Sequence, residues 1–195
     1  MKPLKVPKML HDVFGEETTL LNILLIALLT VFIMAALLLR SSETFAEAGL
    51  IKGGIAFLLI ADIIAGAIAN FTKGTNDFYA QRPLNRWIFI AIHVQPLLLA
   101  WLLNSSLLEA FVIWTAVIVS AIITNLLSGR PYQRVVGAFF MGIGVFLVLV
   151  LTQNDAIVLL TANLFFVIKV VFSFSVNHES THVGLSGGQH EHHIL

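Results

Sequence analysis

Three ionisable residues, Asp62, His93 and Lys169, lie inside long apolar stretches of the sequence. An ionisable side chain in the middle of a membrane helix costs about 2.5–3.5 kcal/mol on insertion scales, so such residues usually face the interior of a helix bundle and mark function. A carboxylate and an ammonium group can pair or hold a polar solute, and a carboxylate or an imidazole can exchange a proton. These residue types are candidates for a solute- or ion-binding site.

The spacing of these residues predicts that they meet. At about 1.5 Å of helix rise per residue, each lies roughly 10–14 Å from the end of its stretch on the same side of the membrane. Asp62 is the predicted partner of Lys169, which requires contact between the second and the sixth apolar stretch. Asp62, Gly66 and Asn70 follow one another at four-residue intervals and therefore share one helix face. Asn70 is included in the candidate site.

Gln95 and Pro96 follow closely after His93. Pro96 cannot donate a hydrogen bond to the carbonyl group of Ile92, and its ring crowds that turn of the helix. The pattern predicts a distorted helix with a freed carbonyl group beside His93, which could bond a water, a side chain or an ion. Gln95 is a further candidate for contact with a bound solute or ion.

Each of the three ionisable residues also has a structural interpretation that the sequence leaves open. Lys169 could extend its long side chain toward the lipid head groups. Asp62 could bond a neighbouring serine or asparagine as part of helix packing, at about 0.6 kcal/mol. His93 could be a neutral imidazole with one satisfied hydrogen bond.

A basic loop is predicted after the second stretch, in the sequence TKGTNDFYAQRP (residues 72–83). Lys73, Arg82 and Arg86, in and just after this loop, could hold a phosphate or a carboxylate, such as a lipid head group. They could equally be ordinary positive charges beside anionic lipid.

The end of the chain holds five of the seven histidines. His182 follows His178 by four positions, which is a zinc-ligand spacing on a helix. His-rich tracts bind divalent metals, although adventitious binding of nickel or zinc would explain the tract as well. No cofactor is expected, and a divalent metal at this tail is the one alternative that the sequence leaves open.

The composition places the chain in a lipid bilayer. Its 195 residues are 58% hydrophobic and 11% charged, with a mean hydropathy of +0.93, whereas soluble domains are about 45–50% apolar and about 25% charged. The sequence has no cysteine, which excludes disulfides, thiol catalysis and iron–sulfur ligation. It also contains no Walker A loop, zincin motif, GxSxG elbow or dinucleotide fingerprint. We expect no nucleic-acid partner.

Six stretches of membrane-spanning length predict an all-α, polytopic bundle with short loops, because lipid forces each backbone polar group to be paired internally. The predicted helices cover roughly residues 19–40, 49–71, 84–104, 107–127, 135–152 and 156–176. They form a membrane domain over 19–176, between a basic N-terminal segment (1–18) and a His-rich tail (177–195). The N-terminal segment could be a short interfacial helix or a loose tail. The first stretch exceeds the roughly 7–15 apolar residues of a signal peptide and is expected to be retained.

The distribution of lysine and arginine predicts the orientation in the membrane. Eight of the eleven cationic residues fall on one side of the predicted helices, and two, Arg40 and Lys52, fall on the other. The eleventh cationic residue, Lys169, lies within the sixth apolar stretch and is not counted for either side. Because the side richer in lysine and arginine is usually cytoplasmic, both termini are expected in the cytoplasm, with the helices in the cell membrane.

Three functions stay open on the sequence. The favoured one is a small solute or ion carrier with a polar intramembrane site open to the cytoplasm. The alternatives are a non-catalytic accessory or assembly protein and a membrane-embedded enzyme acting on a lipid head group. The lipid bilayer is the expected partner. Small residues such as Gly49 and Gly53 could also join copies of the chain into a homo-oligomer.

Overall fold

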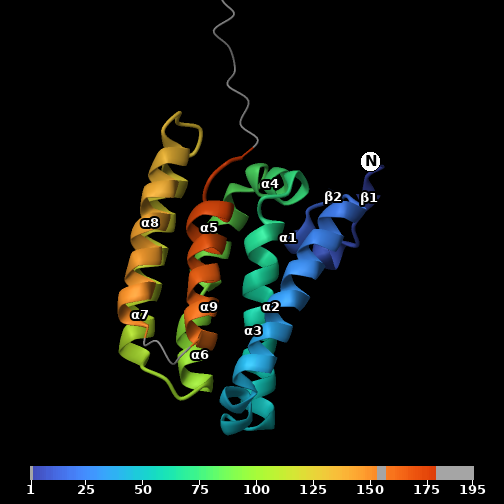
Figure 1. Cartoon of the computed structure of the whole chain (residues 1–195). Coiled ribbons are helices and arrows are strands. Elements are labelled where there is room, and N and C mark those ends of the chain that lie inside the picture. Colours follow the sequence, from blue (N-terminus) through green and yellow to red (C-terminus); the bar gives the residue numbers. More distant parts are fainter. Residues whose placement is uncertain (1, 153–156, 179–195) are drawn as a thin grey trace, which may run out of the picture.

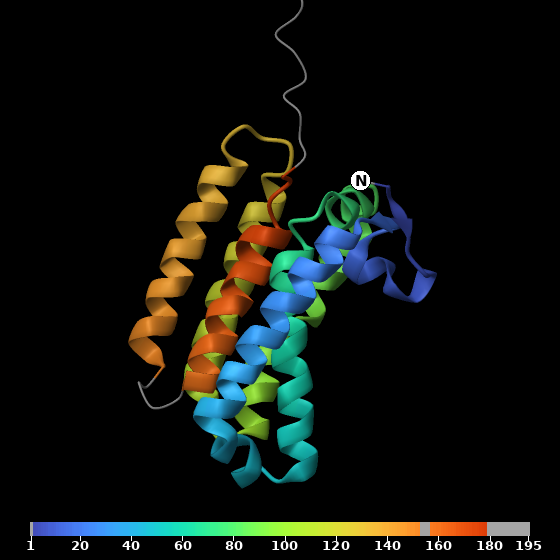
Figure 2. The same ribbon diagram turned by 45° about the vertical axis from the view of Figure 1, so that its right-hand side comes forward.

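A computed structural model describes residues 2–152 and 157–178 (Figure 1). Within these residues the chain is all-α, as predicted, apart from a two-stranded antiparallel hairpin near the N-terminus. The long helices run side by side, with α4 and the hairpin at one end of the bundle (Figure 2). We call this the α4 end, and the end that carries the α2–α3 turn the opposite end.

The described residues form thirteen elements. In chain order they are β1 (Leu4–Lys5), η1 (Lys8–Leu10), α1 (His11–Phe14), β2 (Glu17–Thr18), α2 (Leu20–Glu47), α3 (Leu50–Ala69), α4 (Lys73–Ala80), α5 (Pro83–Ile92), α6 (Gln95–Leu102), α7 (Leu107–Leu126), α8 (Gln133–Leu151), α9 (Ile157–Val167) and the π-helix η2 (Ile168–Phe174).

In the described part of the chain, five helices are long and apolar enough to cross a membrane: α2, α3, α7, α8 and α9 continued by η2. They correspond to five of the six predicted stretches. Helix α2 runs on beyond the predicted end at residue 40 as far as Glu47, with non-helical backbone at Ser41 (φ −148°, ψ 37°). The loop expected after residue 40 is therefore largely helical.

The predicted span over residues 84–104 is not one helix. It consists of α5 and α6, which are separated at His93 and Val94. Because Pro96 has no N–H group, the carbonyl of Ile92 lacks its usual helical partner and accepts a hydrogen bond from the N–H of Val94 (2.9 Å) instead. The predicted count of six spans is thus approximate, since one of the six is broken near its middle.

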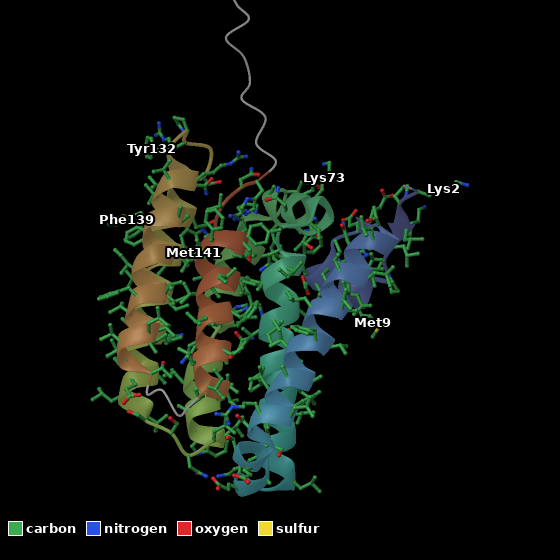
Figure 3. All side chains as sticks on the ribbon, in the orientation of Figure 1. Lys2, Met9, Lys73, Tyr132, Phe139 and Met141 are labelled. Carbon is green, nitrogen blue, oxygen red and sulfur yellow. The ribbon has the colours of Figure 1, made fainter. Side chains whose placement is uncertain are left out.

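Helix α9 and its continuation η2 form the centre of the bundle, in contact with α2, α3, α6, α7 and α8. Of the residues in the span formed by α9 and η2, 61% are buried, whereas 17% of the residues in the spans of α2 and α8 are buried. The outer helices expose large apolar side chains such as Leu28 and Phe32 on α2 and Phe139 on α8, which points away from the bundle in Figure 3. Such faces fit contact with lipid, as in a multi-pass membrane protein.

The predicted loop after α3 contains a helix, α4, so that prediction was wrong. Thr72 caps the helix by accepting a hydrogen bond from the N–H of Thr75. The buried residues of α4 include Asn76 and Tyr79 as well as Phe78, and the helix packs against α1, β2 and α5. This helix is short and polar and has no apolar pattern of the membrane type. Its stability comes from long-range contacts, which a local sequence pattern does not contain.

The N-terminal segment folds as the β1–β2 hairpin, with Leu4 paired to Thr18 and Lys5 to Glu17, around the short turns η1 and α1. It is neither a lone interfacial helix nor a loose tail. Its backbone is tied to α4, because Thr75 Oγ1 donates a hydrogen bond to the carbonyl of Val13 at 2.8 Å.

The hairpin approaches α4 most closely at two glycines. A Cβ atom on Gly15 would lie 2.1 Å from the carbonyl carbon of Gly74, and Gly15 has a φ of +73°. We expect Gly15→Ala to detach residues 2–18 from α4, because backbone atoms cannot move aside. Gly49→Ala is the matched control, since Gly49 has a φ of +82° but open space around it. Hydrogen–deuterium exchange of residues 2–18 should rise for Gly15→Ala alone. Unchanged exchange would contradict the close packing.

Gly53, proposed for association between copies, packs inside the chain, as does Gly144, whereas Gly49 has open space around it. A Cβ atom on Gly53 would lie 2.2 Å from the carbonyl oxygen of Phe45, and one on Gly144 would lie 2.8 Å from Val167 Cγ1. These glycines allow α2 to approach α3 and α8 to approach α9. A homo-oligomer stays a prediction.

Candidate functional site

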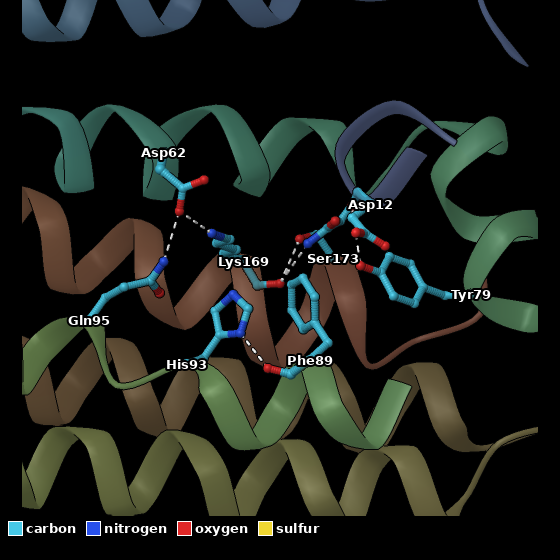
Figure 4. A network of polar contacts seen from close by, with 9 residues as sticks. Asp12, Asp62, Tyr79, Phe89, His93, Gln95, Lys169 and Ser173 are labelled. Carbon is cyan, nitrogen blue, oxygen red and sulfur yellow. Dashed lines mark hydrogen bonds and ion pairs between the residues drawn. The ribbon is translucent and has the colours of Figure 1, made fainter. Parts of the chain in front are cut away.

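Asp62 and Lys169 form an ion pair, with Lys169 Nζ 2.8 Å from Asp62 Oδ2 (Figure 4). The contact between the second and sixth predicted stretches is thereby confirmed, and a lysine extended toward the head groups is excluded for this conformation. The two side chains differ sharply in environment, because that of Lys169 is 4% exposed and that of Asp62 is 54% exposed. The pair thus has one covered partner and one partner that is open to its surroundings.

Two local features bring the lysine to the aspartate. Lys169 lies in the π-helix η2, a helix type that is rare and frequent at functional sites. Its backbone carbonyl accepts hydrogen bonds from Ser173 Oγ at 2.9 Å and from Asn70 Nδ2 at 3.4 Å. Asn70 therefore fixes the lysine's backbone rather than extending the polar surface, while Asp62 holds its ammonium group.

Gly66 gives the lysine side chain room to cross α3. A Cβ atom at this position would lie 2.5 Å from Lys169 Cε and 3.0 Å from Nζ. We expect Gly66→Ala to displace the ammonium group and to lower the free energy of unfolding by about 1–3 kcal/mol, as overpacking does. Gly54→Ala on the same helix is the matched control, because nothing lies within 4 Å of its Cβ position. Equilibrium unfolding in detergent compares the two, and equal effects would contradict this role of Gly66.

The break between α5 and α6 positions Gln95. Trp114 Nε1 donates a hydrogen bond to the carbonyl of His93 at 2.9 Å and so satisfies the backbone at the break. Helix α6 begins at Gln95, with Pro96 in its first turn, where the missing N–H group costs nothing. Gln95 Nε2 in turn donates to Asp62 Oδ2 at 2.8 Å. Asp62 Oδ2 therefore accepts hydrogen bonds from α6 and from η2 together.

His93 is buried and lies against aromatic rings. Its Nδ1 faces the carbonyl oxygen of Phe89. The ring centroid lies 3.8 Å from that of Phe89 and 6.5 Å from that of Phe166. Since a carbonyl oxygen can only accept, Nδ1 carries the hydrogen of the neutral ring and Nε2 keeps a lone pair.

A partly open cavity of about 380 Å³ lies beside the ion pair. It brings together four of the predicted site residues: Asp62, His93, Gln95 and Lys169. The remaining lining comes from α1, α4 and α5 and consists of Asp12, Val13, Tyr79, Asn85, Ile88, Phe89 and Ile92. Asn70 does not line this cavity.

Asp12 and Tyr79 contribute to the cavity from the α4 end (Figure 4). The Tyr79 hydroxyl donates a hydrogen bond to the backbone carbonyl of Asp12 at 3.2 Å. Burial raises the pKa of Tyr79, and the nearby Asp12 carboxylate raises it further. The phenol is therefore protonated at neutral pH and holds the N-terminal segment over the cavity.

A second cavity, of about 280 Å³, lies toward the opposite end of the bundle. Its lining includes Pro96, Glu109 and Asn163 and the polar turn of residues 104–106. Asn163 is buried and makes no side-chain hydrogen bond with any residue that the structure describes. Because Gln95 lines the first cavity and Pro96 the second, the two cavities approach each other at the break between α5 and α6.

The cations of the predicted basic loop do not form one cluster. Lys73 forms an ion pair with Asp77, and Arg82 Nη2 lies 2.6 Å from Glu16 Oε1. Arg86 is buried, and its guanidinium group donates to Asn125 Oδ1 at 2.8 Å and to the backbone carbonyls at the end of η2. Arg86 therefore braces the bundle. Contact of these cations with anions or head groups stays a prediction.

The predicted metal site at the tail falls partly outside the described residues. His178 packs against Phe71 and Phe172, with its Nε2 3.2 Å from the carbonyl of Phe172. His182 lies outside the described residues. Among those that are described, no group of three or more His, Asp or Glu side chains could hold a metal ion. Metal binding by the tail stays a prediction.

Sequence reasoning missed the residues that close the cavity from other elements. Asp12 lies in the segment interpreted as an interfacial helix or a loose tail, and Tyr79 lies in the predicted loop. Phe89 and Trp114 are aromatic side chains in a sequence that is rich in apolar residues. Among these residues, only Tyr79 could have been recognised from the sequence, because it is an aromatic residue within a polar segment.

No protein-family model, no curated protein and no solved structure matches the chain.

Proposed function

We propose that the protein is a membrane carrier for a small solute or ion, with the cavity beside Asp62 as its binding site. The observation that carries the proposal is the half-exposed Asp62 carboxylate, held by Lys169 and Gln95 at the level of the membrane helices. A carboxylate at this depth cannot face hydrocarbon without a large cost. Water or a polar ligand in the cavity removes that cost.

The broken helix supports transport over a fixed structural role. In many carriers, discontinuous helices near the bilayer midplane form the binding site, and the chain rocks or bends around it. Here α5 and α6 separate at His93 and Val94, and one cavity lies toward each end of the bundle. We propose that the α4 end faces the cytoplasm, because it carries most of the lysines and arginines.

Access to the site from both sides of the membrane tests the proposal. The chain has no cysteine, so Ile92→Cys, in the cavity lining, can be labelled without background. In right-side-out and inside-out vesicles, a membrane-impermeant thiol reagent should reach this cysteine from both sides, because a carrier opens its site to each side in turn. Leu58→Cys is the control, since Leu58 is exposed on the outer surface of α3 and lines neither cavity.

Labelling from one side alone would contradict a carrier. A cavity that opens only at the α4 end would then favour the enzyme or accessory functions. Labelling of Ile92→Cys and Leu58→Cys at equal rates would show that the reagent crosses the bilayer, and the comparison would then be repeated with a larger charged reagent.

A further inference from the structure

The cavity beside Asp62 offers hydrogen-bond acceptors that the protein itself does not use. Asp62 Oδ2 accepts from Lys169 Nζ and from Gln95 Nε2, each at 2.8 Å. Asp62 Oδ1 accepts no hydrogen bond from any described residue. Since the Asp62 side chain is half exposed and lines the cavity, this oxygen is open to a ligand.

Gln95 supplies a second unused acceptor. Only the NH₂ group of the amide can donate to a carboxylate, so the contact with Asp62 fixes the amide orientation. Gln95 Oε1 is therefore the free atom, and it is buried without a partner among the residues that the structure describes. A buried carbonyl oxygen left without a donor destabilises the folded state, so a donor is expected to reach it from the cavity.

His93 supplies a third. Its Nδ1 is committed to the carbonyl of Phe89, which leaves the lone pair of Nε2 with no hydrogen bond from any described group. The donors of the site are partly committed. The Lys169 ammonium gives one of its three N–H groups to Asp62, and its side chain is 4% exposed. The Tyr79 hydroxyl donates to the Asp12 carbonyl. Asn85 lines the cavity as well and can both donate and accept.

The charges favour a cation. Lys169 offsets the charge of Asp62, and the cavity lining also contains the Asp12 carboxylate. Beside the polar groups stand apolar walls formed by Ile88, Phe89 and Ile92. A ligand that fits this lining has a positive, donor-rich end and a short apolar part.

We propose that the cavity binds a small primary amine in its ammonium form. An ammonium group has three N–H donors, which match the three unused acceptors at Asp62 Oδ1, Gln95 Oε1 and His93 Nε2. An anion would meet lone pairs and a carboxylate, and a quaternary ammonium ion would bring the charge without donors. The proposal rests on the proposed function, because it names the class of solute that the carrier would take.

The experiment uses four probes that separate charge, donors and apolar size. Binding to the purified full chain in detergent is measured by thermal shift and by calorimetry at pH 7 and constant ionic strength, with butylammonium, tetramethylammonium, butyrate and 1-butanol. We expect saturable binding of butylammonium and at least tenfold weaker binding of the other three. Sodium and potassium chloride at matched concentration should not compete.

Gln95→Met tests the site with little change of shape. It removes Oε1 together with the Nε2 donor to Asp62 Oδ2, and we expect it to weaken butylammonium binding at least tenfold. Gln81→Met is the matched control, because Gln81 is exposed and does not line this cavity. Unchanged affinity in Gln95→Met, with the variant folded by its circular dichroism and elution profile, would contradict the proposal. So would tight binding of butyrate, equal binding of tetramethylammonium, competition by sodium or potassium, or no binding of butylammonium at tens of millimolar. The two-sided labelling of Ile92→Cys uses no amine, so it judges the carrier proposal separately.

Discussion

Asp62→Asn is expected to destabilise the protein more than Lys169→Met, and the double variant is expected to recover much of the loss. Removing the carboxylate leaves the Lys169 ammonium buried with no counter-charge, and breaking a buried pair in this way costs about 3–5 kcal/mol. Removing the lysine leaves Asp62, whose side chain is half exposed and can be solvated in the cavity. That loss should be about 1 kcal/mol or less, as at exposed pairs.

A double-mutant cycle measures this coupling. The free energy of unfolding is determined in detergent for Asp62→Asn, Lys169→Met and the double variant. Asp77→Asn is the matched control, because Asp77 pairs with Lys73 at the surface and should lose about 1 kcal/mol or less. Additive losses in the cycle, or a larger loss for Lys169→Met than for Asp62→Asn, would contradict the assigned environments of the two charges.

Arg86→Met is expected to lower the free energy of unfolding by about 3 kcal/mol or more. Arg86 is 6% exposed. Its guanidinium group donates to Asn125 Oδ1 and to the carbonyls of Phe174 and Ser175 at 2.8–3.2 Å. A hydrogen bond to a charged group contributes about 1.5–3 kcal/mol, and a cation beside a helix C-terminus adds a favourable dipole interaction. Methionine fills a similar volume but leaves these buried acceptors with fewer donors.

Arg134→Met serves as the matched control for Arg86→Met. Arg134 also donates to backbone carbonyls beyond η2, those of Asn177 and His178, but it is exposed. Water can replace its hydrogen bonds, so we expect a loss of about 1 kcal/mol or less. The comparison is made by equilibrium unfolding in detergent. Similar losses for the two variants would show that Arg86 does not brace the bundle as described.

The sequence predicts the fold class and the central contact because both depend on short-range regularities. Runs of apolar residues define the membrane helices, and a constant rise per residue places Asp62 and Lys169 at matching depth. Pro96 predicts the disruption of the third span through its missing N–H group. The exact place of the break, at His93 and Val94, depends on Trp114, which satisfies the freed backbone from another helix.

Other features could not be predicted because they depend on contacts distant in the chain. Helix α4 is polar and short, and its burial against the hairpin requires the close approach of Gly15 and Gly74. Arg86 resembled a surface cation in the sequence, but the end of η2 covers it. The unused acceptors of Gln95 and His93 follow from which of their atoms the protein already occupies, and no residue pattern contains that information.

A spin label at Ile92→Cys measures most directly whether water reaches the cavity beside Asp62. Ile92 is 63% exposed beside the cavity, and Leu58 is 68% exposed on the outer surface of α3. In reconstituted membranes, collision rates with a neutral, water-soluble nickel complex and with oxygen distinguish an aqueous from a lipid environment. We predict that the nickel complex reaches the label at Ile92 far more often than the label at Leu58→Cys. Equal rates at both positions, with oxygen dominant at each, would contradict a polar cavity beside Asp62.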